Sequence, residues 1–219
     1  SCIRTKKGEK MKNRVLITGG AGFIGHQVIY RFLRVSNFDV ITLDRLDTSG
    51  NLNRIHEVLE ENPEWKKRFD YYWHDLKAPI NETLANQMGR VTHIVHLAAG
   101  SHVDRSIDDP MSFVMDNVVG TTNMLIYARD LPKNDFKMFI NFSTDEVFGP
   151  APDGVAYKEW DRHKPTNPYS ASKSAAENIC IAYENTYKVP IMSINVMNAF
   201  GARQHVEKLI PKTISNIMS

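Results

Sequence analysis

Short apolar runs alternate with longer amphipathic segments along most of the chain. The first run, residues 15–18, has no polar alternation, which is typical of a parallel strand covered on both faces. Five further runs lie at residues 39–43, 69–74, 93–100, 136–143 and 190–196. Helical spacing marks residues 23–33, 52–62, 80–88, 110–129, 169–187 and 209–218. This alternation predicts an α/β fold with a doubly wound parallel sheet and right-handed crossovers.

A glycine-rich turn joins the first strand to the first helix. Gly19, Gly22 and Gly25 follow the strand with two residues between successive glycines. Such glycines allow a tight turn, a close approach of the backbone to a phosphate, and close packing of the helix on the sheet. The turn, with Phe23 and Ile24, could hold a dinucleotide pyrophosphate at the positive end of the helix. The glycines alone are weak support, because such turns also open many helices for structural reasons.

A carboxylate ends the second apolar run. Asp44 lies nineteen residues after Gly25, where a dinucleotide-binding fold places an acid that accepts hydrogen bonds from the adenine ribose. The alternative is an ordinary turn or helix cap, but the order of strand, glycine turn, helix, strand and acid favours the cofactor site. A carboxylate repels a 2′-phosphate, so we expect NAD rather than NADP. Arg45 weakens this preference, because an arginine can accommodate that phosphate.

Composition and charge indicate one domain and exclude few partners. The 219 residues, 42% of them apolar, can bury a sizeable core, while a net charge of +2 predicts little. We expect residues 1–10 to be a disordered or added extension, and residues 11–219 to form the cofactor-binding domain. No apolar stretch approaches the ~18–20 residues that span a bilayer, and no leader is visible. We expect a soluble protein with no nucleic-acid or membrane partner.

The two cysteines give neither a disulfide framework nor a metal-binding spacing. Cys2 lies in the basic N-terminal stretch and Cys180 within a helical pattern. A reducing, cytoplasmic setting follows from this pattern, with Cys180 as a buried small hydrophobe. We expect no metal site.

Small and acidic residues follow the third and fourth runs. Ala98 and Ala99 would leave room for the nicotinamide half of a dinucleotide at the carboxyl end of a central strand. Asp75 and Leu76 are candidate neighbours of the adenine. For Asp75 a cap of the local turn is an equally good interpretation.

Two clusters of reactive side chains lie at strand ends. Tyr169 and Lys173 are four residues apart on one helix face, so the ammonium could lower the pKa of the phenol and make it a base. Without the glycine turn, surface decoration would be the better interpretation. Ser143, Thr144, Asp145 and Glu146 end the fifth strand. The two acids are either solvated loop charges or an acid/base pair held at different pKa values.

These residues carry a resemblance to a known family. Gly19-x-x-Gly22-x-x-Gly25, Asp44 and Tyr169-x-x-x-Lys173 resemble the extended short-chain dehydrogenase/reductases, which have a Rossmann fold. More narrowly, the chain resembles the nucleoside-diphosphate-glucose 4,6-dehydratases. That match lies in residues 96–99, 101–106, 143–149 and 207–211, and Thr144-Asp145-Glu146 is its most specific part. The resemblance also implies that family members continue beyond Ser219, so that most of the C-terminal substrate domain is absent here.

The resemblance implies a lyase that uses NAD as an internal redox cofactor. Tyr169, with Lys173 and Thr144, would take the proton of the sugar 4-hydroxyl while hydride passes to NAD. Glu146 would remove the C5 proton and Asp145 would protonate the departing 6-hydroxyl, which leaves as water. Return of hydride to C6 would give a 4-keto-6-deoxy sugar. The implied substrate is dTDP- or UDP-glucose.

Binding roles and a partner are implied in the same way. Ser101 and Ser143 would lie beside cofactor or sugar, and Asn117 near the nicotinamide. The residues implied around the sugar or its diphosphate are His102, Asn198, Glu207, Lys208 and Leu209. Residues 110–129 and 169–187 resemble helices that pair in a homodimer, although their apolar positions also suit the chain's own core.

Two rival functions remain at this point. A UDP-sugar epimerase or decarboxylase would share NAD, Tyr169 and Lys173, but Asp145 and Glu146 argue against it. A catalytically inert NAD-binding fragment is the other.

Overall fold

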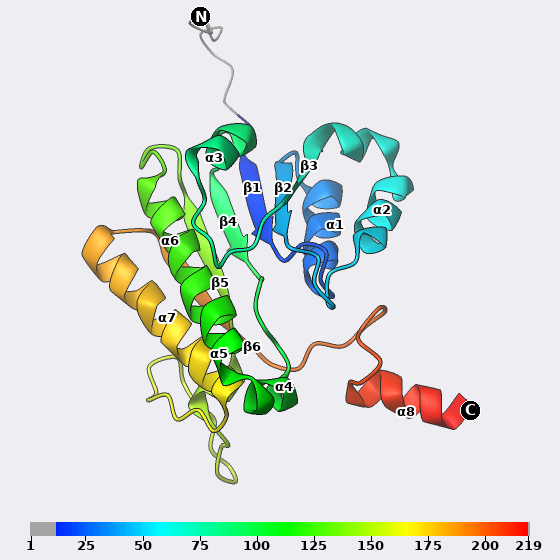
Figure 1. Ribbon diagram of the computed structural model, residues 1–219, viewed down its shortest axis with the longest axis vertical. Coiled ribbons are helices and arrows are strands. Elements are labelled where there is room, and N and C mark those ends of the chain that lie inside the picture. The colour runs from blue at the N-terminus through cyan, green and yellow to red at the C-terminus, as the bar shows by residue number, and fades with distance from the viewer. Residues whose placement is uncertain (1–11, 219) are drawn as a thin grey trace, which may run out of the picture.

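Six parallel strands form one sheet in the order β3-β2-β1-β4-β5-β6 (Figure 1). The computed structural model describes residues 12–218. The strands are β1 (Arg14–Thr18), β2 (Asp39–Asp44), β3 (Phe69–Trp73), β4 (His93–His96), β5 (Met138–Thr144) and β6 (Ile191–Val196). The predicted doubly wound parallel sheet is confirmed. Residues 1–10, expected to be an extension, lie outside the described part, as does Cys2.

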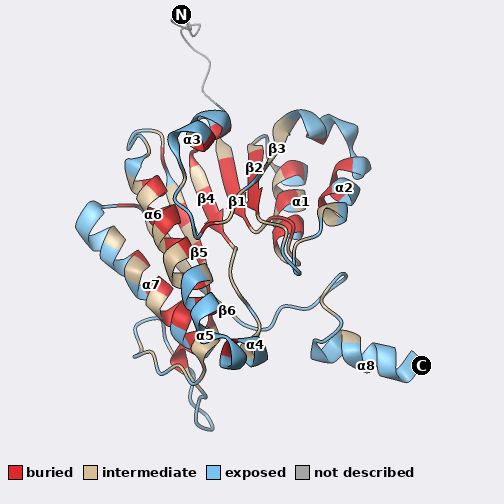
Figure 2. Ribbon diagram, viewed as in Figure 1, coloured by how far each residue is buried: buried red, intermediate tan, exposed pale blue. Residues whose placement is uncertain are grey.

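Helices cover both faces of this sheet. They are α1 (Gly25–Val35), α2 (Leu52–Glu61), α3 (Glu82–Met88), α6 (Gly120–Asp130) and α7 (Pro168–Tyr187). A further helix, α8 (Leu209–Met218), lies away from the sheet (Figure 1). One core packs α1 and α2 on the side of Val15 and Ile17, and the other packs α3, α6 and α7 on the side of Leu16. Because successive strand side chains point to opposite faces, a continuous apolar run such as β1 supplies both cores. Figure 2 shows the central strands as the most buried part.

The strand order reverses between β1 and β4. β1 pairs with β2 on one side and with β4 on the other, in register from Val15 opposite His93 to Thr18 opposite His96. The chain therefore leaves the carboxyl ends of β1 and β4 toward opposite faces of the sheet. This opens a crevice at the point where doubly wound sheets bind ligands.

The helix expected over residues 110–129 forms, but its middle turn is π-helical. It consists of α5 (Pro110–Phe113), the π-helical segment η2 (Val114–Val119) and α6, which continue one another. A short helix, α4 (Val103–Asp108), precedes it. Its sequence has no apolar stripe; it is held by tertiary contacts, among them a hydrogen bond from Tyr169 N to the buried Ser106 Oγ, 3.1 Å long.

Other boundaries moved by a few residues. β4 ends at His96, because the alanines after it belong to the cleft-lining loop. Two 3₁₀ segments, η1 (Pro63–Arg68) and η3 (Asp145–Phe148), were not expected. Cys180 is buried, as predicted.

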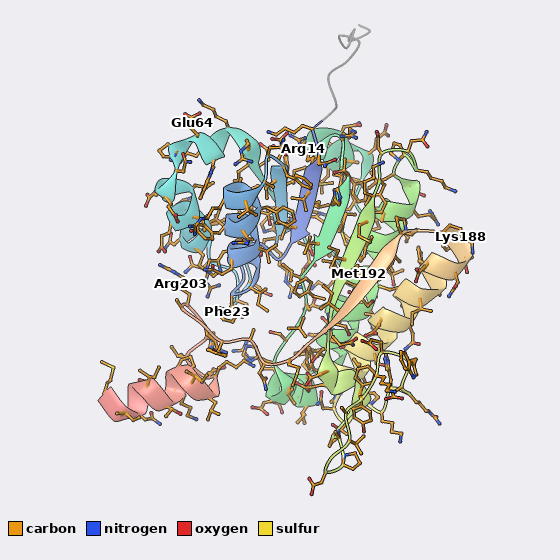
Figure 3. The ribbon with its side chains drawn as sticks, turned by 180° about the vertical axis from the view of Figure 1, so that it is seen from behind. Arg14, Phe23, Glu64, Lys188, Met192 and Arg203 are labelled. Carbon is orange, nitrogen blue, oxygen red and sulfur yellow. The ribbon has the colours of Figure 1, made fainter. Side chains whose placement is uncertain are left out.

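The last helix is the most exposed element. No residue of α8 is buried (Figure 2). Leu209, Ile217 and Met218 are among its exposed apolar side chains. Met192 of β6, labelled in the rear view of Figure 3, is also exposed. None of the helices within residues 12–218 combines the length and the apolar character needed to cross a bilayer.

Candidate active site

A cleft of about 370 Å³ opens at the carboxyl ends of the strands, where the strand order reverses. Its walls come from the glycine turn, the ends of β2, β3, β4, β5 and β6, and the start of α7. Most of the residues selected from the sequence line it: Gly19, Gly22, Phe23, Ile24, Gly25, Asp44, Asp75, Leu76, Ala98, Ala99, Ser101, His102, Ser143, Thr144, Asp145, Glu146, Tyr169, Lys173, Asn198 and Lys208. The sheet topology therefore gathers side chains from 190 residues of sequence into one cavity.

The glycine turn leaves no room for side chains. Gly19 has φ +72°, and a Cβ there would lie 2.9 Å from the backbone of Ala98. A Cβ at Gly25 would overlap the carbonyl oxygen of Gly19. Both positions thus require glycine, one for its dihedral angle and both for a close approach of backbone segments. The resulting cradle of backbone N–H groups fits the pyrophosphate of a dinucleotide.

Asp44 ties this turn to the second strand. Its Oδ2 accepts a hydrogen bond from Ala21 N over 2.9 Å, and its Oδ1 accepts one from Leu46 N over 2.8 Å. Burial raises the pKa of Asp44, and these two backbone bonds oppose that rise. Asp44 caps its own turn and also lines the cleft, so its contact with an adenine ribose stays a prediction.

A buried hydroxyl without a partner faces the same cleft. Ser143 is buried at the end of β5, and no group within residues 12–218 bonds its Oγ. An unpaired buried hydroxyl is costly, so this position would gain from a hydrogen bond to a bound ligand or water. The glycine cradle and this hydroxyl fit a dinucleotide with a sugar beside it.

The helix α7 begins with a full set of capping interactions. The side chain of Asn167 accepts a hydrogen bond from Ser170 N over 2.8 Å, Ser170 Oγ bonds back to Asn167 N, and Pro168 opens the helix. This fixed start directs Tyr169 and Lys173, one turn apart, to the cleft. The Lys173 Nζ donates to the carbonyl oxygen of Phe142 over 2.5 Å.

The pKa of Tyr169 differs from our expectation. It is raised to about 12, chiefly by burial and further by the negative charge of Glu146, against a hydrogen bond with Thr144 that lowers it. Burial in turn lowers the pKa of Lys173 to about 8. The expected lowering of the phenol's pKa by Lys173 is therefore wrong for the chain by itself. The physical reason is that burial disfavours the charged phenolate and the negative charge of Glu146 repels it, while the Lys173 ammonium donates its hydrogen bond to the backbone of β5.

The two acids stand on a single 3₁₀ turn directly after β5. Thr144 caps this turn by accepting a hydrogen bond from Glu146 N over 3.3 Å, and its hydroxyl donates to Asp145 Oδ1 over 3.2 Å. The amide of Asn167 donates to Glu146 Oε2 over 3.2 Å. Glu146 is exposed to solvent and Asp145 is partly buried, so the neighbouring carboxylates have different surroundings.

A buried histidine that we had not selected joins β1 to β4. Thr18 Oγ1 accepts hydrogen bonds from Leu97 N and Ala98 N, each 3.2 Å, so its proton points to His96 Nδ1, 2.8 Å away. His96 Nε2 then donates to Thr121 Oγ1 over 3.0 Å. Complete burial lowers the pKa of His96 to about 3, which keeps the ring neutral. This network ties the end of β1 and the loop after β4 to helix α6.

Three selected residues are not in the cleft wall. Asn117 is buried behind it, where its amide binds both backbone groups of Gly100 and donates to Ser172 Oγ over 2.8 Å. Glu207 lies 3.5–3.9 Å from the side chains of His102, Arg105 and His205. The third, Leu209, is exposed on α8.

Several residues of the cleft wall were missed, notably Asp47, Arg54, Lys77, Asp116 and His205. Arg54 lies on the polar side of α2, where spacing alone indicates solvent, yet it donates to the carbonyl oxygens of Ala21 and Ser49. The signal for Asp116 was its position as a single acid inside an apolar helix. Arg203, seen in Figure 3 on the same side as Phe23, pairs with Glu57 of α2, so the segment after β6 reaches the glycine-turn side.

The family model for GDP-mannose 4,6-dehydratase matches residues 16–219. The chain belongs to this family. Among curated members, the dTDP-glucose 4,6-dehydratase of Salmonella typhimurium is 35% identical over 221 residues, which cover 94% of this chain and 60% of that protein. The chain thus spans about three fifths of the length of the curated 4,6-dehydratases that it matches.

Solved structures of this superfamily have the same architecture. The dTDP-glucose 4,6-dehydratase of Streptomyces venezuelae, solved with NAD bound, matches with a TM-score of 0.82 and 35% identity, over 94% of this chain and 62% of that chain. The UDP-glucose 4-epimerase of Thermus thermophilus in complex with NAD matches with a TM-score of 0.76 and 30% identity, over 89% of this chain and 58% of that chain. The likeness therefore spans the 4,6-dehydratases and the epimerases.

Proposed function

We propose that this chain forms the cofactor-binding and catalytic part of an NAD-dependent nucleoside-diphosphate-glucose 4,6-dehydratase. The observation that carries the proposal is the convergence of Asp145, Glu146, Thr144 and Tyr169 on the cleft that the glycine turn also lines. An enzyme that only oxidises and reduces its sugar needs Tyr169 but not the two carboxylates. Two further carboxylates at the sugar position suit the elimination of water.

The cofactor would lie across the cleft. The glycine turn would hold the pyrophosphate, Asp44 the adenine ribose, and Ser143 would gain the hydrogen-bond partner that the protein does not supply. NAD, when bound, supplies the acceptor for the C4 hydride and the donor that returns it to C6. Ala98 and Ala99 present small side chains at this edge and leave space for the ring.

The protein's own side chains would move the protons. Tyr169 takes the proton of the 4-hydroxyl, held in place by Thr144, and Lys173 supplies positive charge one turn away. Glu146 then removes the C5 proton, which the ketone at C4 has acidified, while Asp145 protonates the 6-hydroxyl. The C6–O bond breaks and water leaves. General acid and base groups of this kind contribute roughly 10²–10⁴-fold each.

Remaining roles rest on the family pattern and on position. Ser101 and Asn198 line the cleft and would contact cofactor or sugar, as would His102 and Lys208. Asn117 would act by holding Gly100. Glu207 and Leu209 would contribute through the segment that follows β6.

The decisive experiment is an incubation of the protein and of its Glu146→Gln variant with NAD and either dTDP-glucose or UDP-glucose. We expect loss of water from the sugar by mass spectrometry and a 4-keto-6-deoxy product that absorbs in alkali. Glu146→Gln should bind NAD normally and eliminate at least about 100-fold more slowly. An epimer of unchanged mass would support the epimerase instead. NAD binding with neither product would support an inert cofactor-binding chain.

We further propose a homodimer through α5, η2 and α7. Of the apolar positions that the sequence left open, Phe113 and Leu125 belong to the chain's own core. Met111, Met115 and Ile181 are exposed on these helices and remain free to meet a second copy. Sedimentation equilibrium of Met115→Glu, compared with Val35→Glu on the exposed part of α1, tests this: only the first should dissociate the dimer. A cytoplasmic location stays a prediction from the cysteine pattern.

A further inference from the structure

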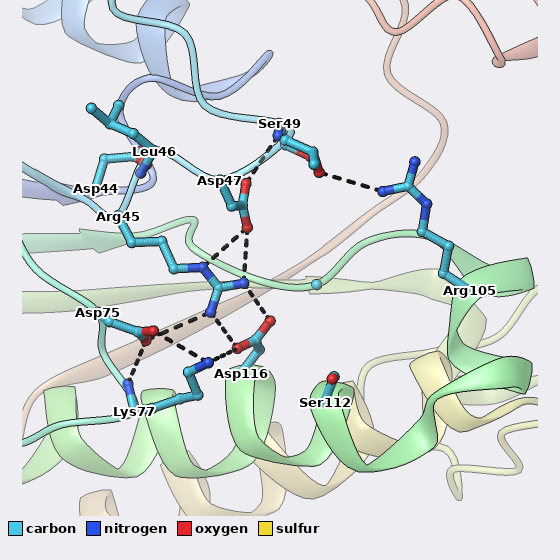
Figure 4. Close-up of polar contacts among 12 residues, drawn as sticks. Asp44, Arg45, Leu46, Asp47, Ser49, Asp75, Lys77, Arg105, Ser112 and Asp116 are labelled. Carbon is cyan, nitrogen blue, oxygen red and sulfur yellow. Dashed lines mark hydrogen bonds and ion pairs between the residues drawn. The ribbon is translucent and has the colours of Figure 1, made fainter.

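The guanidinium of Arg45 is held by carboxylates at the end of β2. Its Nη1 and Nη2 donate to the two oxygens of Asp116 over 2.6 and 2.7 Å, in a bidentate pair (Figure 4). Its Nε and Nη2 donate to Asp47 Oδ2 over 3.1 and 2.8 Å. Asp75 lies 3.6 Å from Nη1 and pairs with Lys77 over 3.2 Å. We refer to these five residues as the Arg45 clamp.

The clamp uses almost all the binding capacity of the arginine. A guanidinium has five N–H donors in a fixed fork. Four hydrogen bonds go to Asp47 and Asp116, and the fifth N–H belongs to Nη1, the atom nearest Asp75. Arg45 thus has no free edge for a phosphate, although it directly follows Asp44.

The charge around this site is negative. At this end of the cleft, four carboxylates, those of Asp44, Asp47, Asp75 and Asp116, face three cations, Arg45, Arg54 and Lys77. Burial raises the pKa of Asp47, but its hydrogen bonds with Ser49 and Arg45 outweigh this and leave the value lowered. A 2′-phosphate, which carries nearly two negative charges at neutral pH, would meet an excess of carboxylates here.

The position of Asp116 depends on the π-helical segment. Asp116 and Asn117 are neighbours in η2, yet Asp116 faces the end of β2 while Asn117 binds Gly100 after β4. The Asp116 side chain is only 13% exposed. The clamp therefore joins three segments, the ends of β2 and β3 and the middle of a long helix, around the adenine side of the cleft.

We propose that Asp116, with Asp47, sets the preference of this chain for NAD over NADP by taking up the guanidinium of Arg45. The inference rests on the proposed function for NAD binding and goes beyond it. An arginine in this sequence position would otherwise be a phosphate site. By binding the guanidinium, Asp116 leaves Arg45 unable to bind a phosphate. Asp116 has this effect without touching the ribose that Asp44 would bind.

The test measures dissociation constants of NADH and NADPH by nucleotide fluorescence for the protein and its variants. The protein itself should bind NADH at least about 100-fold more tightly than NADPH. Asp116→Asn should tighten NADPH binding at least about tenfold and change NADH binding by less than about threefold. Arg45→Ala added to Asp116→Asn should abolish the gain, because the freed arginine causes it.

Asp75→Asn is the matched control. It removes the same charge from the same cluster but leaves all four Arg45 hydrogen bonds in place. The affinity for NADPH relative to NADH should therefore gain at most about threefold, whatever Asp75 contributes beside the adenine. Asp47→Asn is a second, more exposed variant for the case that Asp116→Asn does not fold, and it should give an intermediate gain. An equal gain in Asp75→Asn, or unchanged NADPH binding in both clamp variants with normal NADH binding, would overturn the inference. A protein that binds neither nucleotide would instead refute the proposed function.

Discussion

Asn167 donates a hydrogen bond to Glu146 and caps the helix that carries Tyr169. The amide nitrogen reaches Glu146 Oε2 over 3.2 Å, while the amide oxygen accepts from Ser170 N over 2.8 Å. One side chain therefore orients the carboxylate proposed for elimination and the phenol proposed for oxidation.

Substitution of Asn167 separates these two effects. Asn167→Ala should lower stability by about 1 kcal/mol through loss of the cap, and should lower kcat by about tenfold because Glu146 loses its orientation. Asn167→Ser keeps a capping oxygen but is too short to reach Glu146, so it should retain the Tm while still losing activity. Native turnover in the serine variant would show that the Asn167–Glu146 bond does not matter for elimination.

The ionisation of Tyr169 should respond to the charge of the cofactor. The phenol has a pKa of about 12 in the chain alone, so at neutral pH it is protonated and cannot act as a base. The positive charge of oxidised nicotinamide favours phenolate. Ultraviolet titration, with Tyr169→Phe to identify the signal, should show a pKa that falls on binding NAD⁺ and stays high with NADH. A value near 12 in both complexes would remove Tyr169 from the role of base.

Gly19 and Gly154 form a matched pair for testing the glycine turn. Both have positive φ, +72° and +75°, but a Cβ at Gly19 would meet the backbone of Ala98 while a Cβ at Gly154 would meet nothing within 4 Å. Each alanine variant should lose about 1–2 kcal/mol of stability from the left-handed backbone, and Gly19→Ala should lose more because its Cβ meets the backbone of Ala98. Only Gly19→Ala should also weaken NADH binding, by at least about tenfold. Equal nucleotide affinities in the two variants would place the cofactor elsewhere.

Acid should destabilise the protein through His96. The folded state holds its pKa near 3, whereas the unfolded chain has the ordinary value of 6.5. The unfolded state therefore binds the proton first, so the stabilisation is complete above pH 6.5 and is lost as the pH falls toward 3. A difference of this size corresponds to on the order of 5 kcal/mol.

Urea unfolding at several pH values measures this loss. His96→Asn should show a flatter pH dependence between pH 6.5 and 4, although its stability at neutral pH will be lower. The exposed His56 provides the control, since His56→Asn should leave the profile unchanged. A profile that keeps its slope in His96→Asn would assign the acid sensitivity to other groups.

The sequence predicted features that are encoded locally. The apolar runs predicted the positions of all six strands. The positions of Gly19 and Asp44 relative to those strands predicted where the cleft lies. Short-range chemistry was sufficient here, because turn geometry and strand burial depend on neighbouring residues.

The missed features depend on pairs that are far apart in the chain. Arg45 and Asp116 are separated by 71 residues, and no spacing rule connects them. The predicted direction of the Tyr169 pKa shift was wrong for the same reason. The helix spacing to Lys173 was right, but burial and the negative charge of Glu146 raise the pKa. Pairing of charges in a cleft becomes visible only when the topology is known.

The π-helical segment has a consequence for how this protein can change during evolution. One residue more or fewer between Pro110 and Asp116 would turn the helix after it by roughly 100°. Asp116 would then leave Arg45, or Asn117 would leave Gly100, since the two neighbours serve opposite ends of the cleft. Substitutions along this helix remain possible. An insertion or deletion before Asp116, however, would break one of the contacts that these two adjacent residues make.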